Sequence, residues 1–171
     1  VASTVNETLL THHLLETIDD AQFRAHVLDQ YLERFRSTLY RQTLFAAFEA
    51  EIHERSADGE ALTPDRLDEL YGARKEQYYE PAAVDETIRA EWLRIPHFYY
   101  NFYVYQYATG LSAAVAIVDR IEREGEPAAA DYREALALGG SEYPLDVLDH
   151  AGVDMAEPAP VETAIEEYDR R

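Results

Sequence analysis

Residues 23–52 read FRAHVLDQYLERFRSTLYRQTLFAAFEAEI, and this stretch decides the fold. It contains neither glycine nor proline, and its large apolar residues recur mostly in steps of three and four. Such spacing places apolar side chains on one face of a helix, so it predicts a long helix with one buried stripe. The predicted stripe consists of Phe23, Val27, Tyr31, Phe35, Leu39, Phe45, Phe48 and Ile52.

Shorter helical patterns lie on both sides of this stretch. A helix is predicted over about Ser3 to Ile18, with Asp19 or Asp20 as the N-cap of the long helix. Thr63-Pro64 is typical of a helix start, and Pro81 ends that helix near Glu80. Further helices are predicted over 84–94, from near Asn101 to Glu124, and within 127–140 and 144–152. The pattern contains no convincing strand and no internal repeat.

We therefore predict an all-α fold, a multi-helix antiparallel array. Its 171 residues match the size of one domain and include 47% hydrophobic residues. Residues 1–171 are expected to form a single helical domain, in which 156–171 is a weakly ordered acidic tail with one weak helix. No apolar run is long enough to span a membrane, no signal peptide is recognised, and the absence of cysteine suits a cytoplasmic protein.

The charge balance is strongly acidic. Thirty-four acidic residues face fifteen basic ones, for a net charge of −19, and Lys75 is the one lysine. Such a chain lacks the basic surface that nucleic acid or an anionic membrane requires. A cationic partner is one interpretation. We prefer an acid-coated surface that stays soluble in a halophilic host, because the acids are spread along the chain.

Residues 95–110, IPHFYYNFYVYQYATG, concentrate aromatic side chains. Seven of these sixteen residues are Phe or Tyr, and five carry a phenol. On a continuous helix Tyr99, Tyr103 and Tyr107 would share one stripe. Most of these rings are expected to belong to the core. His97 differs, because an imidazole or a phenol can donate a hydrogen bond to an oxygen that gains negative charge during amide hydrolysis.

Four ordered segments carry a resemblance to a known family. They are VASTVNETLL (1–10), YRQTLFAAFEAEIHE (40–54), IPHFYYNFYVYQYATG (95–110) and GGSEYPLDVLDHAGVDM (139–155). Together they resemble the C-terminal part of the oligoendopeptidase F group of thimet-oligopeptidase-like zinc metallopeptidases. The resemblance covers nearly the whole chain. It implies a helical catalytic domain with a deep channel that admits only short peptides.

The resemblance also implies site residues. His97 corresponds to the family histidine that binds the scissile carbonyl, and Tyr103 is the best match to its oxyanion-binding tyrosine. Tyr107 or Tyr105 would supply a second phenol. The family has glycines between the histidine and the first tyrosine, whereas positions 99–101 read Tyr-Tyr-Asn here.

The zinc-binding motif of that family, HExxH, is absent from these residues. By the resemblance, the third zinc ligand is a glutamate immediately before a segment like Val1–Thr4. The chain is therefore expected to be a fragment of a longer catalytic domain, to bind no zinc and to be inactive by itself. Glu7 is a candidate to orient a zinc-bound histidine, or is an ordinary carboxylate near a helix start.

Two alternatives stay open. His12 and Glu16, which share one helix face beside His13, could form a metal site on the first helix, although no third ligand follows at a defined spacing. His26, His53 and His150 have no such neighbours and are interpreted as surface or structural residues. The missing zinc motif also permits a stand-alone acidic helical binding module without catalytic activity. A chain cut within its active-site helix would expose apolar surface and form homo-oligomers.

Overall fold

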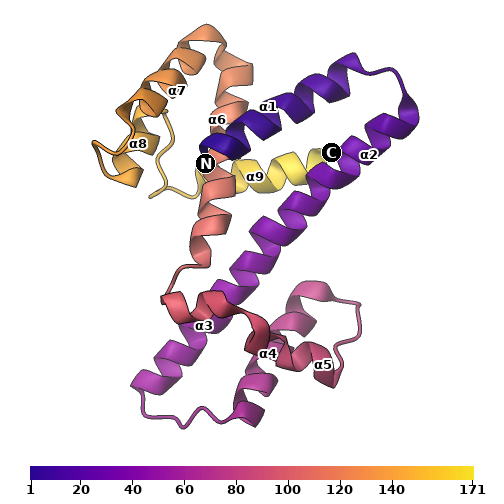
Figure 1. Cartoon of the computed structure of the whole chain (residues 1–171), viewed down its shortest axis with the longest axis vertical. Helices are drawn as coiled ribbons and strands as arrows, with labels where there is room; N and C mark the ends of the chain where they lie inside the picture. The colour runs from indigo at the N-terminus through magenta and orange to yellow at the C-terminus, as the bar shows by residue number, and fades with distance from the viewer. The chain divides into compact units, whose positions relative to one another are not determined.

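The computed structural model describes residues 1–171 and contains helices and no strand (Figure 1), which confirms the all-α prediction. None of its helices combines the length and the apolar character needed to cross a bilayer. The α-helices are α1 (Ala2–Thr17), α2 (Ala21–Arg34), α3 (Arg41–Ala57), α4 (Pro64–Tyr79), α5 (Glu86–Arg89), α6 (Tyr105–Glu124), α7 (Glu126–Leu138), α8 (Pro144–His150) and α9 (Ala159–Arg170). Between them lie a π-helix, Phe35–Tyr40, and two 3₁₀ helices, Ala90–Arg94 and Pro96–Tyr100.

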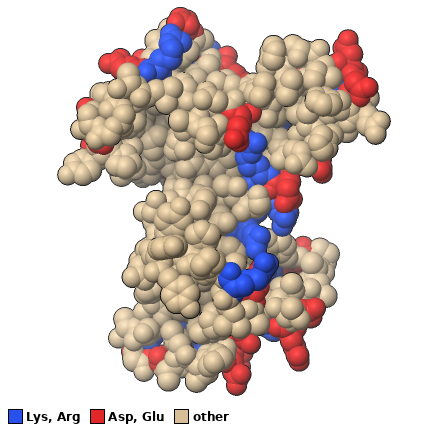
Figure 2. All heavy atoms as spheres, in the orientation of Figure 1, with Lys and Arg blue, Asp and Glu red and all other residues tan.

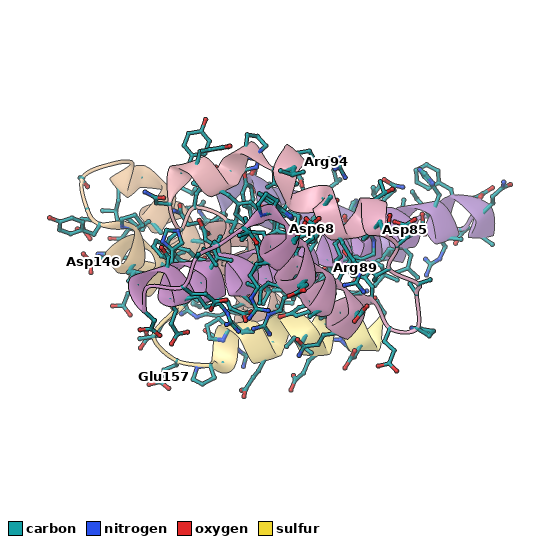
Figure 3. The ribbon with its side chains drawn as sticks, turned by 90° about the horizontal axis from the view of Figure 1, so that it is seen from below. Asp68, Asp85, Arg89, Arg94, Asp146 and Glu157 are labelled. Atoms are coloured by element: carbon teal, nitrogen blue, oxygen red, sulfur yellow. The ribbon has the colours of Figure 1, made fainter.

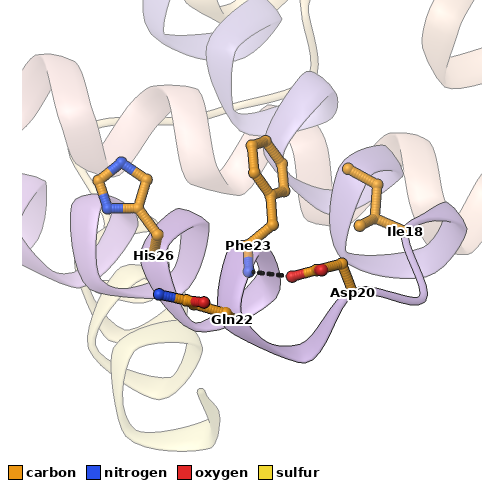
Figure 4. A pocket seen from close by; sticks show the side chains of 5 residues that line it. All are labelled: Ile18, Asp20, Gln22, Phe23 and His26. Carbon is orange, nitrogen blue, oxygen red and sulfur yellow. Dashed lines mark hydrogen bonds between the residues drawn. The ribbon is translucent and has the colours of Figure 1, made fainter.

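The predicted helix starts are confirmed by their caps. A side-chain oxygen of Asp20 accepts a hydrogen bond from the Phe23 backbone N–H at 2.7 Å (Figure 4), which satisfies one donor in the first turn of α2. Thr63 caps α4 in the same way through the Arg66 N–H, with Pro64 at the first helical position.

The long helical stretch is interrupted in a way that its spacing did not predict. α2 and α3 are joined directly by the π-helix Phe35–Tyr40, where each turn holds an extra residue. Most of the predicted stripe is buried or half-buried, but the prediction is wrong for Phe23, whose side chain is 45% exposed. Phe23 lies in the first turn of α2 and lines an open pocket together with Ile18 and His26 (Figure 4).

The chain divides into two compact units. Unit 1 comprises Val1–Arg36 and Thr109–Arg171, and unit 2 comprises Ser37–Ala108. In unit 1 the small residues Ala113 and Ala114 of α6 are fully buried. They lie in one apolar core with Val5, Ile117, Val118, Tyr132, Ala135, Ala151 and Val153.

A buried polar cluster connects four helices of unit 1. His12 of α1 hydrogen-bonds Glu167 of α9 through Nε2 at 2.9 Å and Glu122 of α6 through Nδ1. The Tyr31 hydroxyl of α2 donates to Glu167 at 3.2 Å, and Arg171 donates to Glu167 at 2.7 Å. Burial raises the pKa of Glu167, but hydrogen bonds from His12, Arg171 and Arg170 outweigh it and lower the pKa to about 2. Helix α9, Ala159–Arg170, thus carries a buried carboxylate.

Unit 2 is organised around aromatic rings and a second buried carboxylate. Its core contains Leu44, Phe45, Phe48, Leu70, Tyr71 and Val104. Glu91 accepts hydrogen bonds from the Tyr71 hydroxyl at 2.7 Å and from Arg41 at 2.6 Å, and pairs with Lys75 at 2.6 Å. The Trp92 indole N–H donates to Asp68, one of the residues labelled in Figure 3, at 2.7 Å. These contacts fasten the 3₁₀ helix Ala90–Arg94 to α4 and α3.

Replacing Glu167 by Ala should lower the free energy of unfolding by about 3 kcal/mol, because the buried donors of His12 and Tyr31 lose their shared acceptor. Urea unfolding measures this change. The exposed neighbour Glu166 is the matched control, and Glu166→Ala should stay within about 0.5 kcal/mol of the parent. Equal stability of the two variants would contradict a structural role for Glu167.

His12 should make stability depend on pH. Burial lowers its pKa, but the hydrogen bonds to Glu167 and Glu122 raise it more, so the folded value lies above the ordinary 6.5. A raised pKa stabilises the fold fully below pH 6.5, and this contribution is lost as the pH rises through the folded value. Urea unfolding as a function of pH should therefore show a decline above about pH 6.5 that disappears in His12→Gln and persists in the exposed control His13→Gln.

Candidate active site

The aromatic segment is not the continuous helix that the sequence predicts from near Asn101. Pro96–Tyr100 form a 3₁₀ helix, Asn101 and Phe102 have positive φ angles of 41° and 56°, and α6 begins only at Tyr105. The predicted stripe through Tyr99, Tyr103 and Tyr107 is therefore wrong. The break in the backbone separates Tyr99 from the other two, and its side chain is 87% exposed.

The break brings His97 and two of the predicted tyrosines together. The His97 ring lies parallel to the Tyr103 ring, with centroids 5.6 Å apart and an interplanar angle of 8°. Tyr107 meets His97 edge-on at 6.0 Å and Tyr103 edge-on at 5.4 Å. The Tyr107 hydroxyl donates a hydrogen bond to the Tyr103 hydroxyl at 3.2 Å. All three side chains are half-buried, so they are held by neighbours and still reach the surface.

Tyr105 and Tyr100 lie at the edge of the group formed by His97, Tyr103 and Tyr107. Tyr105 precedes Tyr107 by two positions at the start of α6, which turns it toward another face of the helix, and its side chain is 50% exposed. Tyr100 was not predicted as a site residue, yet its ring lies 6.4 Å from His97 and 6.0 Å from Tyr103. The spacing of three between His97 and Tyr100 could have indicated this contact, because residues three apart align on a 3₁₀ helix.

Hydrogen bonding within the cluster changes the acidity of one phenol. The bond that Tyr107 donates to Tyr103 is the main cause that raises the Tyr107 pKa, and burial adds to it. A donated hydrogen bond stabilises the neutral phenol, so Tyr107 keeps its proton. Tyr103 accepts this bond, and its own hydroxyl proton stays available for an outside acceptor. The cluster can therefore present an imidazole and a phenol as neighbouring hydrogen-bond donors.

Glu7 lies in the other unit, on α1. Its carboxylate is 54% exposed and pairs with Arg34 at 3.0 Å. This ion pair involves the Oε2 atom of Glu7.

The two histidines of the alternative metal site, His12 and His13, lie in different surroundings. His12 is buried in the cluster with Glu167 and Glu122, whereas His13 and Glu16 are exposed. No group of three or more His, Cys, Asp or Glu side chains is arranged to hold a metal ion. The other histidines occupy unrelated places: His26 borders the hollow of Figure 4, His53 contacts Phe102, and His150 hydrogen-bonds Glu142.

The helical fold agrees with what comparisons with known proteins show. Residues 1–167 match Peptidase family M3, and the chain belongs to this family. Oligopeptidase PepF of Bacillus subtilis is 48% identical over the whole chain, which covers 26% of that protein. An oligoendopeptidase F homologue of Lactococcus lactis is 45% identical, again over the whole chain and 29% of its own length.

A solved structure extends the similarity to three dimensions. The crystal structure of oligoendopeptidase-F from Enterococcus faecium matches 99% of this chain with a TM-score of 0.94 and 45% identity, over 33% of its own length. The chain thus spans about a quarter to a third of these relatives and corresponds to their C-terminal part.

Replacing Tyr103 by Phe should lower the Tyr107 pKa toward 10.0, because the acceptor of its hydrogen bond is removed. NMR titration of tyrosine rings labelled at Cζ measures this pKa directly. Tyr99→Phe, an exposed substitution in the same segment, should leave the Tyr107 pKa where it is. An unchanged Tyr107 titration in Tyr103→Phe would contradict the hydrogen bond.

Proposed function

We propose that this chain is the carbonyl-binding, C-terminal part of the catalytic domain of a zinc-dependent oligoendopeptidase that cleaves short peptides. Membership of Peptidase family M3 and relatives named as oligopeptidases support this proposal over the acidic binding module. The observation that carries it is the approach of the His97 imidazole to the Tyr103 and Tyr107 phenols.

In the proposed mechanism His97 and Tyr103 bind the scissile carbonyl. When a nucleophile adds to the carbonyl carbon, the oxygen gains negative charge, and hydrogen bonds to that oxygen strengthen. The His97 ring N–H and the Tyr103 O–H are the donors. Tyr107 supports Tyr103 by donating to its oxygen, which polarises the Tyr103 hydroxyl and makes it a better donor. Tyr105, on another face of α6, is the weaker candidate for a second phenol.

The residues of this chain do not fit a zinc site, because the sequence lacks HExxH and the structure holds no cluster of ligating side chains. We therefore propose that the zinc ligands lie in residues outside this chain and that the chain alone does not hydrolyse peptides. Glu7 remains our candidate for orienting one of the metal-bound histidines.

The remaining proposals concern the surroundings of the enzyme. Short peptides are the proposed partners, and neither nucleic acid nor a membrane is expected to bind such an acidic surface. We propose a cytoplasmic location in a halophilic host. Acidic side chains in Figure 2 are scattered over the visible face, in keeping with a solubilising role.

Exposed apolar side chains such as Leu10 and Leu145 would support the formation of homo-oligomers.

In the full-length peptidase, His97→Ala and Tyr103→Phe should each lower kcat by about 100-fold, because each removes a donor to the developing oxyanion. KM should change little, since these hydrogen bonds strengthen mainly in the transition state. Steady-state hydrolysis of a short fluorogenic peptide measures both constants. Tyr99→Phe, the exposed control, should keep the parental kcat.

Chelation should abolish the parental activity, and zinc should restore it. Parental kcat in both His97→Ala and Tyr103→Phe would overturn the site assignment, whatever the chelator does.

A further inference from the structure

We propose that Glu49 is a positioning residue whose buried carboxyl group fixes the backbone turn between His97 and Tyr103. The inference rests on the proposed function, because Glu49 would act on the reaction only through these two side chains.

The turn itself is conformationally unfavourable. Asn101 and Phe102 both have positive φ angles, 41° and 56°, and neither is glycine. Asparagine tolerates this backbone region, but a bulky residue such as phenylalanine adopts it only where its surroundings enforce it. Something outside the turn must therefore hold Phe102.

Helix α3 supplies two contacts to Phe102. The Phe102 backbone N–H donates a hydrogen bond to Glu49 Oε1 at 2.8 Å, and Glu49 is only 1% exposed. One helical turn further along α3, the His53 ring lies against the Phe102 ring with centroids 4.5 Å apart. Glu49 and His53 thus contact the backbone and the side chain of the same residue from one face of a regular helix.

The position of Glu49 is fixed by its neighbours on α3. Its helical neighbours Phe45 and Phe48 are buried in the core of unit 2, and both pack against Phe98, which follows His97. The core therefore fixes the residues just before the turn, and Glu49 fixes the turn itself. Tyr103 comes directly after Phe102, so a change at the Phe102 amide would shift the Tyr103 hydroxyl relative to His97.

This arrangement predicts that the reach of the side chain at position 49 matters more than its charge. Gln has the same length as Glu and can accept the Phe102 N–H through its amide oxygen, whereas Asp keeps the carboxyl group but is one methylene shorter. A displacement of about 1 Å in a catalytic group can cost up to 100-fold in rate.

The test compares Glu49→Gln and Glu49→Asp in the full-length peptidase. Glu49→Gln should keep kcat within about threefold of the parent, and Glu49→Asp should lower kcat about tenfold or more with KM nearly unchanged. Hydrogen–deuterium exchange of residues 97–103 gives a readout independent of activity. Exchange there should become faster in Glu49→Asp and stay parental in Glu49→Gln, because only the latter protects the Phe102 amide.

Glu51 provides the matched control. It lies on the same helix, accepts hydrogen bonds from Arg55 and Arg74, and has the same side chain. Glu51→Asp should disturb those ion pairs but leave both kcat and the exchange of residues 97–103 at parental values.

The outcomes separate this inference from the proposed function. Parental kcat and parental exchange in Glu49→Asp would overturn the inference, as would a greater loss in Glu49→Gln than in Glu49→Asp. If His97→Ala and Tyr103→Phe keep parental kcat, the proposed function fails, while the exchange experiment still decides whether Glu49 holds the turn. If Glu49→Asp does not fold, faster exchange of residues 97–103 in Glu49→Gln counts against the inference and parental exchange supports it.

Discussion

The candidate site depends on two consecutive residues that adopt a backbone conformation ordinarily left to glycine. Positive φ angles at Asn101 and Phe102 end one helical segment and redirect the chain before α6 starts. His97, ahead of this break, can therefore face Tyr103, which follows it. His97 and Tyr103 are six positions apart in the sequence. On an uninterrupted helix, residues with this spacing lie on different faces.

Local sequence signals predicted most of the fold but not this turn. Asp20 and Thr63 mark helix starts because a cap acts on residues only three positions away. The turn at Phe102 depends instead on Glu49, which is 53 residues distant in sequence. No local pattern contains that contact, so the periodicity alone favoured a continuous helix. His12 illustrates the same limit, because its acceptor Glu167 lies on the last helix of the chain.

The acidic residues also fall into two groups, exposed and buried, which the composition does not distinguish. Most of the acids contribute net charge and surface polarity, but Glu49, Glu91 and Glu167 are buried. Each of the three accepts hydrogen bonds from donors on other elements and so links segments that are remote in sequence. Net charge can be counted from the sequence, whereas this division appears only once the donors are placed.

The buried pair of Lys75 and Glu91 has a practical consequence. Lys75 carries the one side-chain amine in the chain, it is 7% exposed, and its ammonium group is paired at 2.6 Å. Amine-directed cross-linkers and acylating labels would consequently find almost no side-chain target on the native surface of these residues. Modification of Lys75 would instead require unit 2 to open. The rate at which Lys75 is acylated would therefore measure how often the structure around the aromatic core opens locally.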